Sequence, residues 1–161
     1  MMVPTTIHMS PINRKMEKVG YPKRIDIVTV FLEYKGKILI LRRSKKVRTM
    51  KYKWAGISGY IEKANSPLKQ ALIEIREETG LSNEKIKFVR SSPPLEATGI
   101  DSPNILWIVH PYLFHTYTNQ IKIDWEHDEY KWINPREITN YECVPKLEDA
   151  LGCVYLTDTI L

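Results

Sequence analysis

The sequence has 161 residues, of which 27% are charged and 43% are hydrophobic, and its net charge at pH 7 is +5. These values exclude a disordered or membrane-embedded chain and predict one soluble globular domain, residues 22–161, preceded by a tail or arm at residues 1–21. No apolar run suggests a signal peptide or a membrane span, so we expect a cytoplasmic protein without a membrane partner. The positive charge favours an anionic partner, either a phosphorylated small molecule or a nucleic acid. The two cysteines, Cys143 and Cys153, are expected to be free buried thiols.

Two strands joined by a hairpin are predicted near the start of the domain. Residues 25–34 are rich in β-branched side chains, Lys35 and Gly36 are turn residues, and residues 37–41 are again apolar. Because apolar residues run almost without interruption through both segments, the pattern predicts strands that are buried on both faces.

The most basic segment of the chain follows, at residues 42–53. Lysine and arginine neutralise phosphate charge, so this segment is a candidate for holding the phosphates of a substrate or the backbone of RNA. The candidate substrate-binding residues are Arg42, Arg43, Lys45 and Arg48, and Lys46 joins them for an RNA partner. A solvated connection that keeps the protein soluble is the alternative.

A short strand at residues 54–61 is expected to deliver Gly59 to a turn that leads into a helix. Ser66 is a good N-cap and Pro67 suits the first helical position, while Gly80 ends the helix. Apolar residues with helical spacing predict the buried face, which is formed by Leu68, Ala71, Leu72 and Ile75.

Three acids, Glu74, Glu77 and Glu78, lie on a neighbouring face near the C-terminal end of this helix. Glu74 and Glu78 repel each other by about 0.2–0.5 kcal/mol, and all three acids lie near the negative end of the helix dipole. No lysine or arginine stands three or four residues from any of them. Converging carboxylates without a basic partner on the helix are typical of a site for Mg²⁺ or Mn²⁺, with a solvated acidic helix end as the alternative.

At these positions the sequence resembles the Nudix hydrolase family (MutT-like), whose box reads G-x5-E-x7-R-E-U-x-E-E-x-G-U, where U is a bulky aliphatic residue. The fixed positions that match at the required spacing are Gly59, Glu74, Ile75, Glu77, Glu78, Gly80 and Leu81. The resemblance implies that Glu74, Glu77 and Glu78 bind the metal, with the carbonyl oxygen of Ser58 as a further ligand.

Two positions depart from the box, because Asn65 stands in place of its first glutamate and Ile73 in place of its arginine. In the family these two residues are close enough to pair, and removing both partners of an ion pair costs far less than leaving one charge alone. We therefore interpret the two departures as one event. Without the arginine that would orient Glu74, we expect a slower site or one with a different metal dependence, and loss of catalysis is the alternative.

The segment after the helix predicts a strand at residues 86–92, which Pro93 and Pro94 end. Residues 93–104 are then expected to form a loop that is long enough to cover a cleft and set specificity.

A long strand is predicted at residues 105–117, and Pro111 within it favours an edge position or a bulge. Trp107 and Tyr112 are candidates for stacking on a nucleobase, with a place in the core as the alternative. The two histidines of this strand are expected to be satisfied residues of the core or sheet face: His110 and His115.

Two further strands are predicted at residues 121–125 and 129–133, and acids stand between them. In Nudix enzymes a glutamate from a comparable late loop often supplies a further metal ligand or the general base. The resemblance implies this role for Glu126 first and for Glu129 second, with surface charge as the alternative.

The C-terminal part of the domain predicts a helical turn at residues 135–139 and a closing helix at residues 145–155. The inward residues of the closing helix are expected to be Leu147, Ala150, Leu151 and Val154.

Strands interleaved with two helices fit an α/β (α+β) fold, and the resemblance implies a Nudix-type α/β/α sandwich with a mixed β-sheet. It also implies a Mg²⁺- or Mn²⁺-dependent hydrolase that cleaves the diphosphate (pyrophosphate) linkage of a nucleoside diphosphate joined to another group. The attacking water would be deprotonated by Glu74 or by Glu126. The expected partner is a small nucleotide or another diphosphate compound, and a homodimer is one expected state because Nudix enzymes are often dimers.

Two other functions remain open from the sequence. A catalytically weak or inactive module would bind nucleotide or RNA on the same scaffold. A divalent ion that merely stabilises the fold would raise the melting temperature without any dependence on a ligand.

Overall fold

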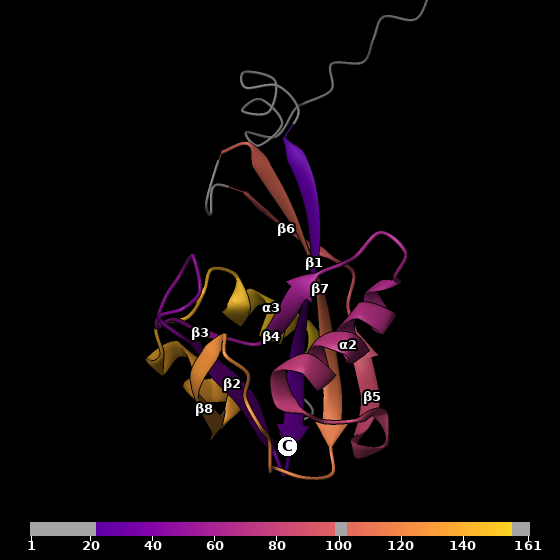
Figure 1. Cartoon of the computed structure of the whole chain (residues 1–161), viewed down its shortest axis with the longest axis vertical. Coiled ribbons are helices and arrows are strands. Elements are labelled where there is room, and N and C mark those ends of the chain that lie inside the picture. Colours follow the sequence, from indigo (N-terminus) through magenta and orange to yellow (C-terminus); the bar gives the residue numbers. More distant parts are fainter. Residues whose placement is uncertain (1–21, 99–102, 156–161) are drawn as a thin grey trace, which may run out of the picture.

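The computed structural model describes residues 22–98 and 103–155, and the arm expected at residues 1–21 lies outside this part of the chain. The described residues form one 8-stranded mixed sheet with helices on both of its faces (Figure 1). The predicted sandwich is therefore confirmed. Within the described residues, every helix is too short or too polar to span a lipid bilayer.

Two long strands, β1 (Lys23–Tyr34) and β7 (Ile105–Thr116), pair in parallel at the centre of the sheet. Each carries two short antiparallel strands, end to end, along its outer edge. The partners of β1 are β2 (Lys37–Arg43) and β4 (Ile57–Tyr60), and those of β7 are β5 (Ile86–Ser91) and β6 (Leu95–Thr98). On its other side β2 pairs with β8 (His127–Ile133), and β3 (Trp54–Ala55) pairs with the end of β2 on the side of β1.

The hairpin between β1 and β2 forms where the sequence predicts it. Lys35 and Gly36 both have positive φ angles, of 48° and 81°, which is the backbone geometry of a two-residue turn that matches the twist of antiparallel strands. The Gly36 N–H donates a hydrogen bond of 2.7 Å to Glu33 Oε1, and this bond stabilises the turn.

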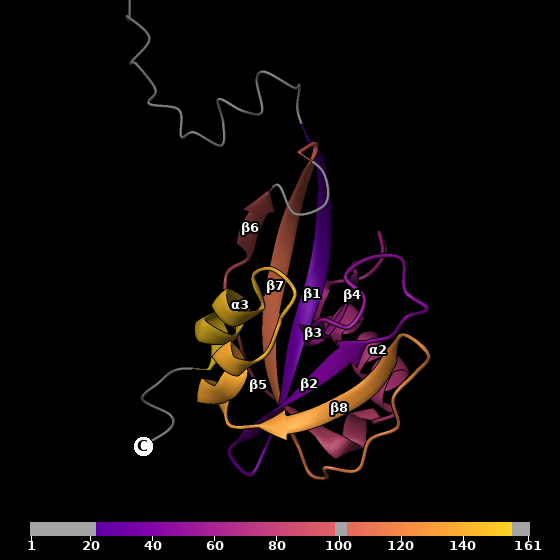
Figure 2. The ribbon, with the colours of Figure 1, turned by 90° about the vertical axis from the view of Figure 1, so that its left-hand side faces the viewer.

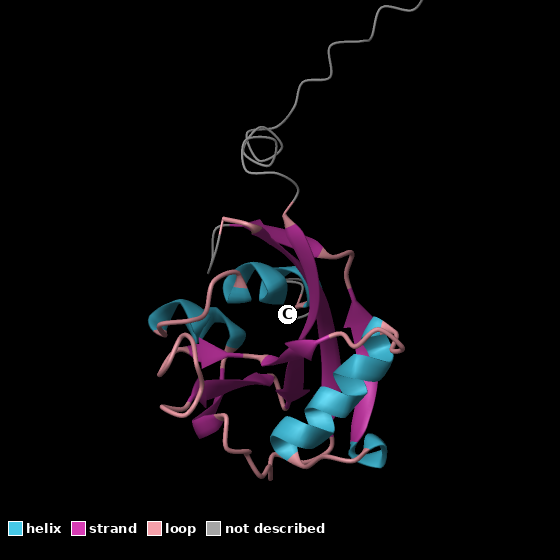
Figure 3. Cartoon of the chain, turned by 45° about the horizontal axis from the view of Figure 1, so that its top comes forward, coloured by secondary structure: helices cyan, strands magenta, loops and turns pink. Residues whose placement is uncertain are grey.

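The two faces of the sheet carry separate clusters of buried side chains. One main helix lies over each face, as Figures 2 and 3 show. Helix α2 (Pro67–Thr79) packs Ala71 and Ile75 onto the face that holds Val28 and Val30 of β1. Helix α3 (Leu147–Val154) packs onto the other face, which holds Phe31. The predicted burial of β1 and β2 on both faces is confirmed, and so are the four inward residues of α3.

Two expectations about the strands are wrong. Residues 95–98 do not belong to a loop, because they pair with β7 as β6, and residues 99–102 lie outside the described part. Residues 121–125 form no strand: Ile121 and Ile123 pack against the core, and the Lys122 N–H donates to the Thr79 carbonyl at 3.0 Å. The alternating pattern of this segment arises because Ile121 and Ile123 contact the core, and the segment does not pair with a neighbouring strand.

Pro111 does not lie at an edge of the sheet, because β7 has partners on both sides. Its carbonyl accepts from the Ser92 N–H, and within a strand the nitrogen and oxygen of one residue face the same neighbour. The missing N–H of Pro111 therefore faces the gap between β5 and β6, where Pro93 and Pro94 interrupt the neighbouring strand. A proline is tolerated here because no strand stands opposite it to accept a hydrogen bond.

The buried face of α2 is rotated from the predicted one. Leu68 is 43% exposed, whereas Gln70 and Glu78 are each 3% exposed. Cys143 and Cys153 are free thiols, as expected, but they are partly exposed rather than buried. The helical turn expected near residue 135 forms as the short helix η2 (Pro135–Asn140), and a second short helix, η1 (Asn83–Lys85), precedes β5.

Candidate active site

A cleft of about 340 Å³ opens between β4, the C-terminal half of α2 and the loop that precedes α3. Its floor comes from the two central strands on the face that α3 covers. Residues from these elements, from β2, β3 and the start of α3, and from two further connecting segments line it: Ile27, Thr29, Arg43, Met50, Ala55, Ser58, Gly59, Tyr60, Glu74, Glu77, Trp107, Val109, Glu126, Val144, Pro145, Lys146 and Leu147.

The strand β4 and the helix α2 bring Gly59 and Glu74 together. Ser66 caps the helix by accepting a hydrogen bond of 3.1 Å from the Lys69 N–H, and Gly80, with φ at 74°, ends it, as predicted. A Cβ atom on Gly59 would overlap the Glu74 carboxylate, so the acid packs directly on the backbone of the strand. Only glycine leaves room for this contact.

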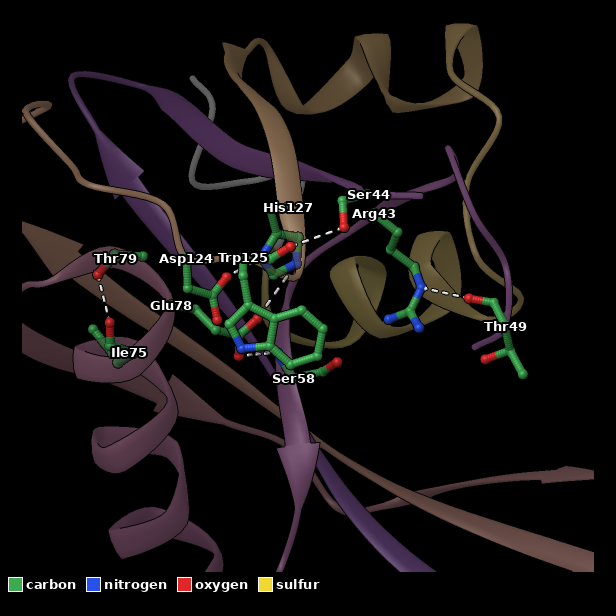
Figure 4. A network of polar contacts seen from close by, with 10 residues as sticks. All are labelled: Arg43, Ser44, Thr49, Ser58, Ile75, Glu78, Thr79, Asp124, Trp125 and His127. Atoms are coloured by element: carbon green, nitrogen blue, oxygen red, sulfur yellow. Dashed lines mark hydrogen bonds and ion pairs between the residues drawn. The ribbon is translucent and has the colours of Figure 1, made fainter. Parts of the chain in front are cut away.

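Glu78 points away from the cleft surface into the protein. The Ser58 N–H donates to Glu78 Oε2 at 3.1 Å, and His127 Nε2 lies 3.5 Å from Glu78 Oε1 (Figure 4). The other ring nitrogen of His127 lies 2.8 Å from Asp124 Oδ1, and the His127 side chain is 2% exposed. His127 thus reaches the acidic helix from β8, although no basic residue stands beside these acids on the helix itself.

Burial and mutual repulsion raise the pKa values of two acids in this group. The pKa of Glu78 lies well above its ordinary value, first because of burial and then because of the charges of Glu74, Asp124 and Glu126. Burial also raises the pKa of Glu74, against which a hydrogen bond from Gln70 acts in the opposite direction. Burial is the main cause of both shifts, and the charges of neighbouring acids add to it.

The turn before β8 places Glu126 at the cleft. The Ser44 N–H donates to the Glu126 carbonyl at 2.7 Å, and Ser44 Oγ donates to the Trp125 carbonyl at 2.9 Å, so this turn is tied to the end of β2. Glu129, the second candidate, does not line the cleft. It lies 3.5 Å from the Arg42 guanidinium on the adjacent strand.

The fit of a divalent ion can be judged from the donors around the cleft. Glu74, Glu77 and Glu126 line it, Glu78 lies behind Glu74, and Ser58 belongs to its wall. These donors are oxygens, which hard cations such as Mg²⁺ and Mn²⁺ prefer. Among the described residues, no group of three or more acids, histidines or cysteines stands close enough to hold an ion as it is. The donor chemistry and the gathering of acids around the cleft fit the ion, but the three helix acids do not converge on one point as predicted.

Of the four basic residues predicted to bind substrate, only Arg43 lines the cleft. Its Nε donates to the Thr49 carbonyl at 3.1 Å (Figure 4). Arg42 instead forms a two-point contact with Asp128, at 2.8 and 3.2 Å. Lys45 and Arg48 are exposed and outside the cleft. A second basic residue of the cleft, Lys146, was not predicted.

The two predicted aromatic candidates lie on opposite faces of the sheet. Trp107 lines the cleft and stacks on Tyr60, with ring centroids 6.2 Å apart and planes at 28°. Tyr112 is 9% exposed in the core cluster beneath α2, so its predicted role in stacking a nucleobase is wrong. The histidines of β7 are satisfied, as expected: His110 lies 2.9 Å from Asp26, and His115 lies 2.8 Å from Glu33.

Sequence reasoning missed Tyr60, Gln70, His127 and Lys146. Tyr60 could have been found, because it directly follows the box glycine on a strand that leads into the cleft. Lys146 and His127 carry no local signal, since each reaches the site through the packing of a distant segment.

Comparisons with known proteins agree with this geometry. The model of the NUDIX domain matches residues 22–151. A MutT protein from Methanosarcina mazei Go1 is similar in structure, with a TM-score of 0.66, 24% identity, and coverage of 81% of this chain and 92% of that one. The Nudix hydrolase RenU from M. smegmatis has a TM-score of 0.67 and 15% identity, and the match covers 86% of this chain and 88% of that one. An Ap4A hydrolase from C. elegans has a TM-score of 0.63 and 14% identity, and the match covers 80% of this chain and 92% of that one.

No curated protein matches the chain. At these identities the solved structures show a shared fold, while the match to the NUDIX domain spans most of the sequence. The chain therefore belongs to the NUDIX domain family.

Proposed function

We propose that the protein is a Mg²⁺- or Mn²⁺-dependent hydrolase that cleaves the diphosphate linkage of a nucleoside diphosphate joined to another group. The observation that carries this proposal is the cleft itself, whose lining includes acids, basic residues and an aromatic pair. A diphosphate linked to a nucleobase has the matching anionic and aromatic parts.

The acids are proposed to hold the ion, with Glu74, Glu77, Glu78 and the Ser58 carbonyl as its ligands and Glu126 nearby. The chemistry that a bound ion supplies is neutralisation of the charge on the phosphate oxygens. Burial is the main cause of the raised pKa values of Glu74 and Glu78, and the charges of neighbouring acids raise them further; a bound cation would relieve this second contribution, which supports the assignment.

Proton transfer and phosphate binding are assigned to other groups of the cleft. Glu74 or Glu126 takes the proton of the attacking water. Arg43 and Lys146 line the cleft and bind phosphate oxygens that the acids do not face.

The nucleobase is proposed to stack on the Tyr60–Trp107 pair. Tyr60 is 63% exposed and lies over Trp107, so one aromatic face is available to a ligand. Stacking on an aromatic side chain contributes about 1–3 kcal/mol per base. The likeness to a protein described as an Ap4A hydrolase also supports a nucleotide substrate.

Turnover tests the proposal directly. The wild-type protein and the Glu77→Gln and Glu78→Gln variants are assayed for phosphate release on a panel of nucleotides and other diphosphates, with Mg²⁺ and Mn²⁺ compared. Each substitution removes one proposed carboxylate ligand of the ion, and we expect turnover to fall by about 10²–10³-fold, as for other groups that stabilise transition-state charge. Unchanged turnover in both variants would remove the metal assignment.

The same assay separates the second hypothesis, a module that binds without catalysis. Such a module would show affinity for a nucleotide or RNA and no release of phosphate. The exposed side chains of Lys45 and Arg48 favour RNA as that partner, and affinity for RNA would then fall steeply with salt.

A further inference from the structure

Gln70 is an uncharged polar side chain buried in α2, one turn before Glu74. It is 3% exposed, which is unusual for glutamine unless each of its polar atoms has a partner. Its Nε2 donates a hydrogen bond of 3.1 Å to Glu74 Oε1, and its Oε1 accepts one of 2.8 Å from Asn65 Nδ2. Asn65 is the residue that replaces the first glutamate of the box.

The orientation of the Gln70 amide follows from its partners. Its Oε1 also accepts from the Glu62 N–H at 3.2 Å, and a backbone N–H can only donate. The oxygen must therefore face Glu62 and Asn65, which leaves the NH₂ group facing Glu74. The Glu62 N–H and the Asn65 side chain thus fix the Gln70 amide so that its NH₂ group donates to the Glu74 carboxylate.

Glu74 is held from two sides as a result. Gly59 provides the surface on which the carboxylate packs, and Gln70 fixes one of its oxygens. The box arginine, which would be expected to orient this acid, is Ile73 in this chain. An uncharged donor at this place adds no positive charge that would compete with a cation in the cleft.

We propose that Gln70, itself oriented by Asn65 and the Glu62 backbone, is a positioning residue that holds the Glu74 carboxylate for metal binding in place of the missing arginine. The inference rests on the proposed function, since it names how one ligand of that site is oriented. Asn65, which departs from the box, then has a role of its own: it donates to Gln70, and Gln70 donates to Glu74, the proposed metal ligand.

The test measures Mn²⁺ affinity, by electron paramagnetic resonance of the free ion, together with kcat, KM and the melting temperature of the full chain. The variants are Gln70→Leu and Asn65→Ala. The control is Thr116→Val, which removes a buried hydroxyl and its contacts with Thr118 at the far end of β7. Groups that orient metal ligands change affinity or activity by about 10–100-fold.

We expect Gln70→Leu to weaken Mn²⁺ binding by about 10–100-fold and to lower kcat in the same range, while KM changes less. Asn65→Ala should lie near the lower end of that range, since the Glu62 N–H still orients the amide. Thr116→Val should lower the melting temperature without changing Mn²⁺ affinity. If Gln70→Leu does not fold, Asn65→Ala, which alters a partly exposed turn residue, decides the question.

The proposal is overturned if the folded Gln70 variant, or Asn65→Ala in its place, binds Mn²⁺ as the control does. A crystal structure of the metal-free protein distinguishes failure of the Gln70 positioning role from failure of the proposed function. In wild type, Glu74 should lie against Gly59 with the Gln70 amide beside it whether or not the protein turns over substrate. A Glu74 carboxylate found elsewhere would reject the positioning role by itself.

Discussion

Gly59 and Glu74 show how one missing side chain shapes the site. The residues lie fifteen positions apart in the sequence, yet the carboxylate of one occupies the space in which the other would carry a Cβ atom. The glycine is therefore required by a close approach and not by its backbone angles, since its φ is not positive.

Gly59→Ala should displace the Glu74 carboxylate and lower both Mn²⁺ affinity and turnover, by about 10–100-fold. The cost in unfolding free energy should stay near 1 kcal/mol, because the acid can rotate toward the open cleft. Binding titration, turnover and chemical denaturation measure the three quantities.

Gly152→Ala is the matched control for this substitution. Gly152 lies in α3, and a Cβ atom there would meet nothing within 4 Å. Because alanine is the better helix former, we expect unfolding free energy to rise by about 0.5–1 kcal/mol with unchanged turnover. If Gly59→Ala behaves in the same way, the close packing of Glu74 has no functional role.

At the scale of elements, the turn before α2 and the helix act as one unit. Ser66 and Pro67 start the helix, and Asn65, just before them, reaches the first buried polar residue within it. The replacement of the box glutamate at position 65 therefore changes the contacts of the helix and not only the turn.

Restoring both box residues, as Asn65→Glu with Ile73→Arg, should give a more stable protein than either single change. Each single change leaves a charge without its partner, and Asn65→Glu also removes the donor to Gln70, at about 1 kcal/mol. Urea denaturation of the four proteins gives the coupling free energy, which we expect to exceed about 0.5 kcal/mol. Equal stability of the double variant and the singles would reject the interpretation that the two departures are one event.

At the scale of the whole molecule, the acidic site links folding to pH and to metal. The folded protein holds protons on Glu78 and Glu74 at pH values where the unfolded chain has lost them, because burial raises both pKa values above 4.5. Unfolding free energy therefore falls as pH rises from about 4.5 through the folded pKa values. Once both acids are ionised, no further loss comes from them.

The metal-free protein should accordingly lose stability as pH rises above the ordinary glutamate pKa of 4.5, and Glu78→Gln should lose less over the same range. The lowered pKa of Asp26, which its hydrogen bond from Arg24 maintains, acts below this window and does not mask the effect. Mn²⁺ at about 100 times its Kd should add about 2.7 kcal/mol to the wild type. Denaturation curves at several pH values, with and without Mn²⁺, measure both effects; stability that rises with pH in metal-free wild type would contradict the assignment.

The sequence by itself determined the hairpin, both main helices, the long strands and the acidic helix end, because each depends on residues that are neighbours along the chain. Caps, turn glycines and apolar periodicity act over a few residues, so Ser66, Gly36 and Gly80 behave as predicted. The Nudix box is also a pattern of nearby residues, so its spacing was enough to indicate the family.

Only the tertiary structure decided which candidate residues lie together in the site. Residues 95–98 form a strand because they pair with β7, and Arg42 binds Asp128 while Arg43 lines the cleft. The same packing buried Gln70 and Glu78 in place of Leu68, and it brought His127 and Lys146 to the site from distant segments. Such contacts join residues far apart in sequence, and their free energy depends on burial and partners that no local pattern encodes.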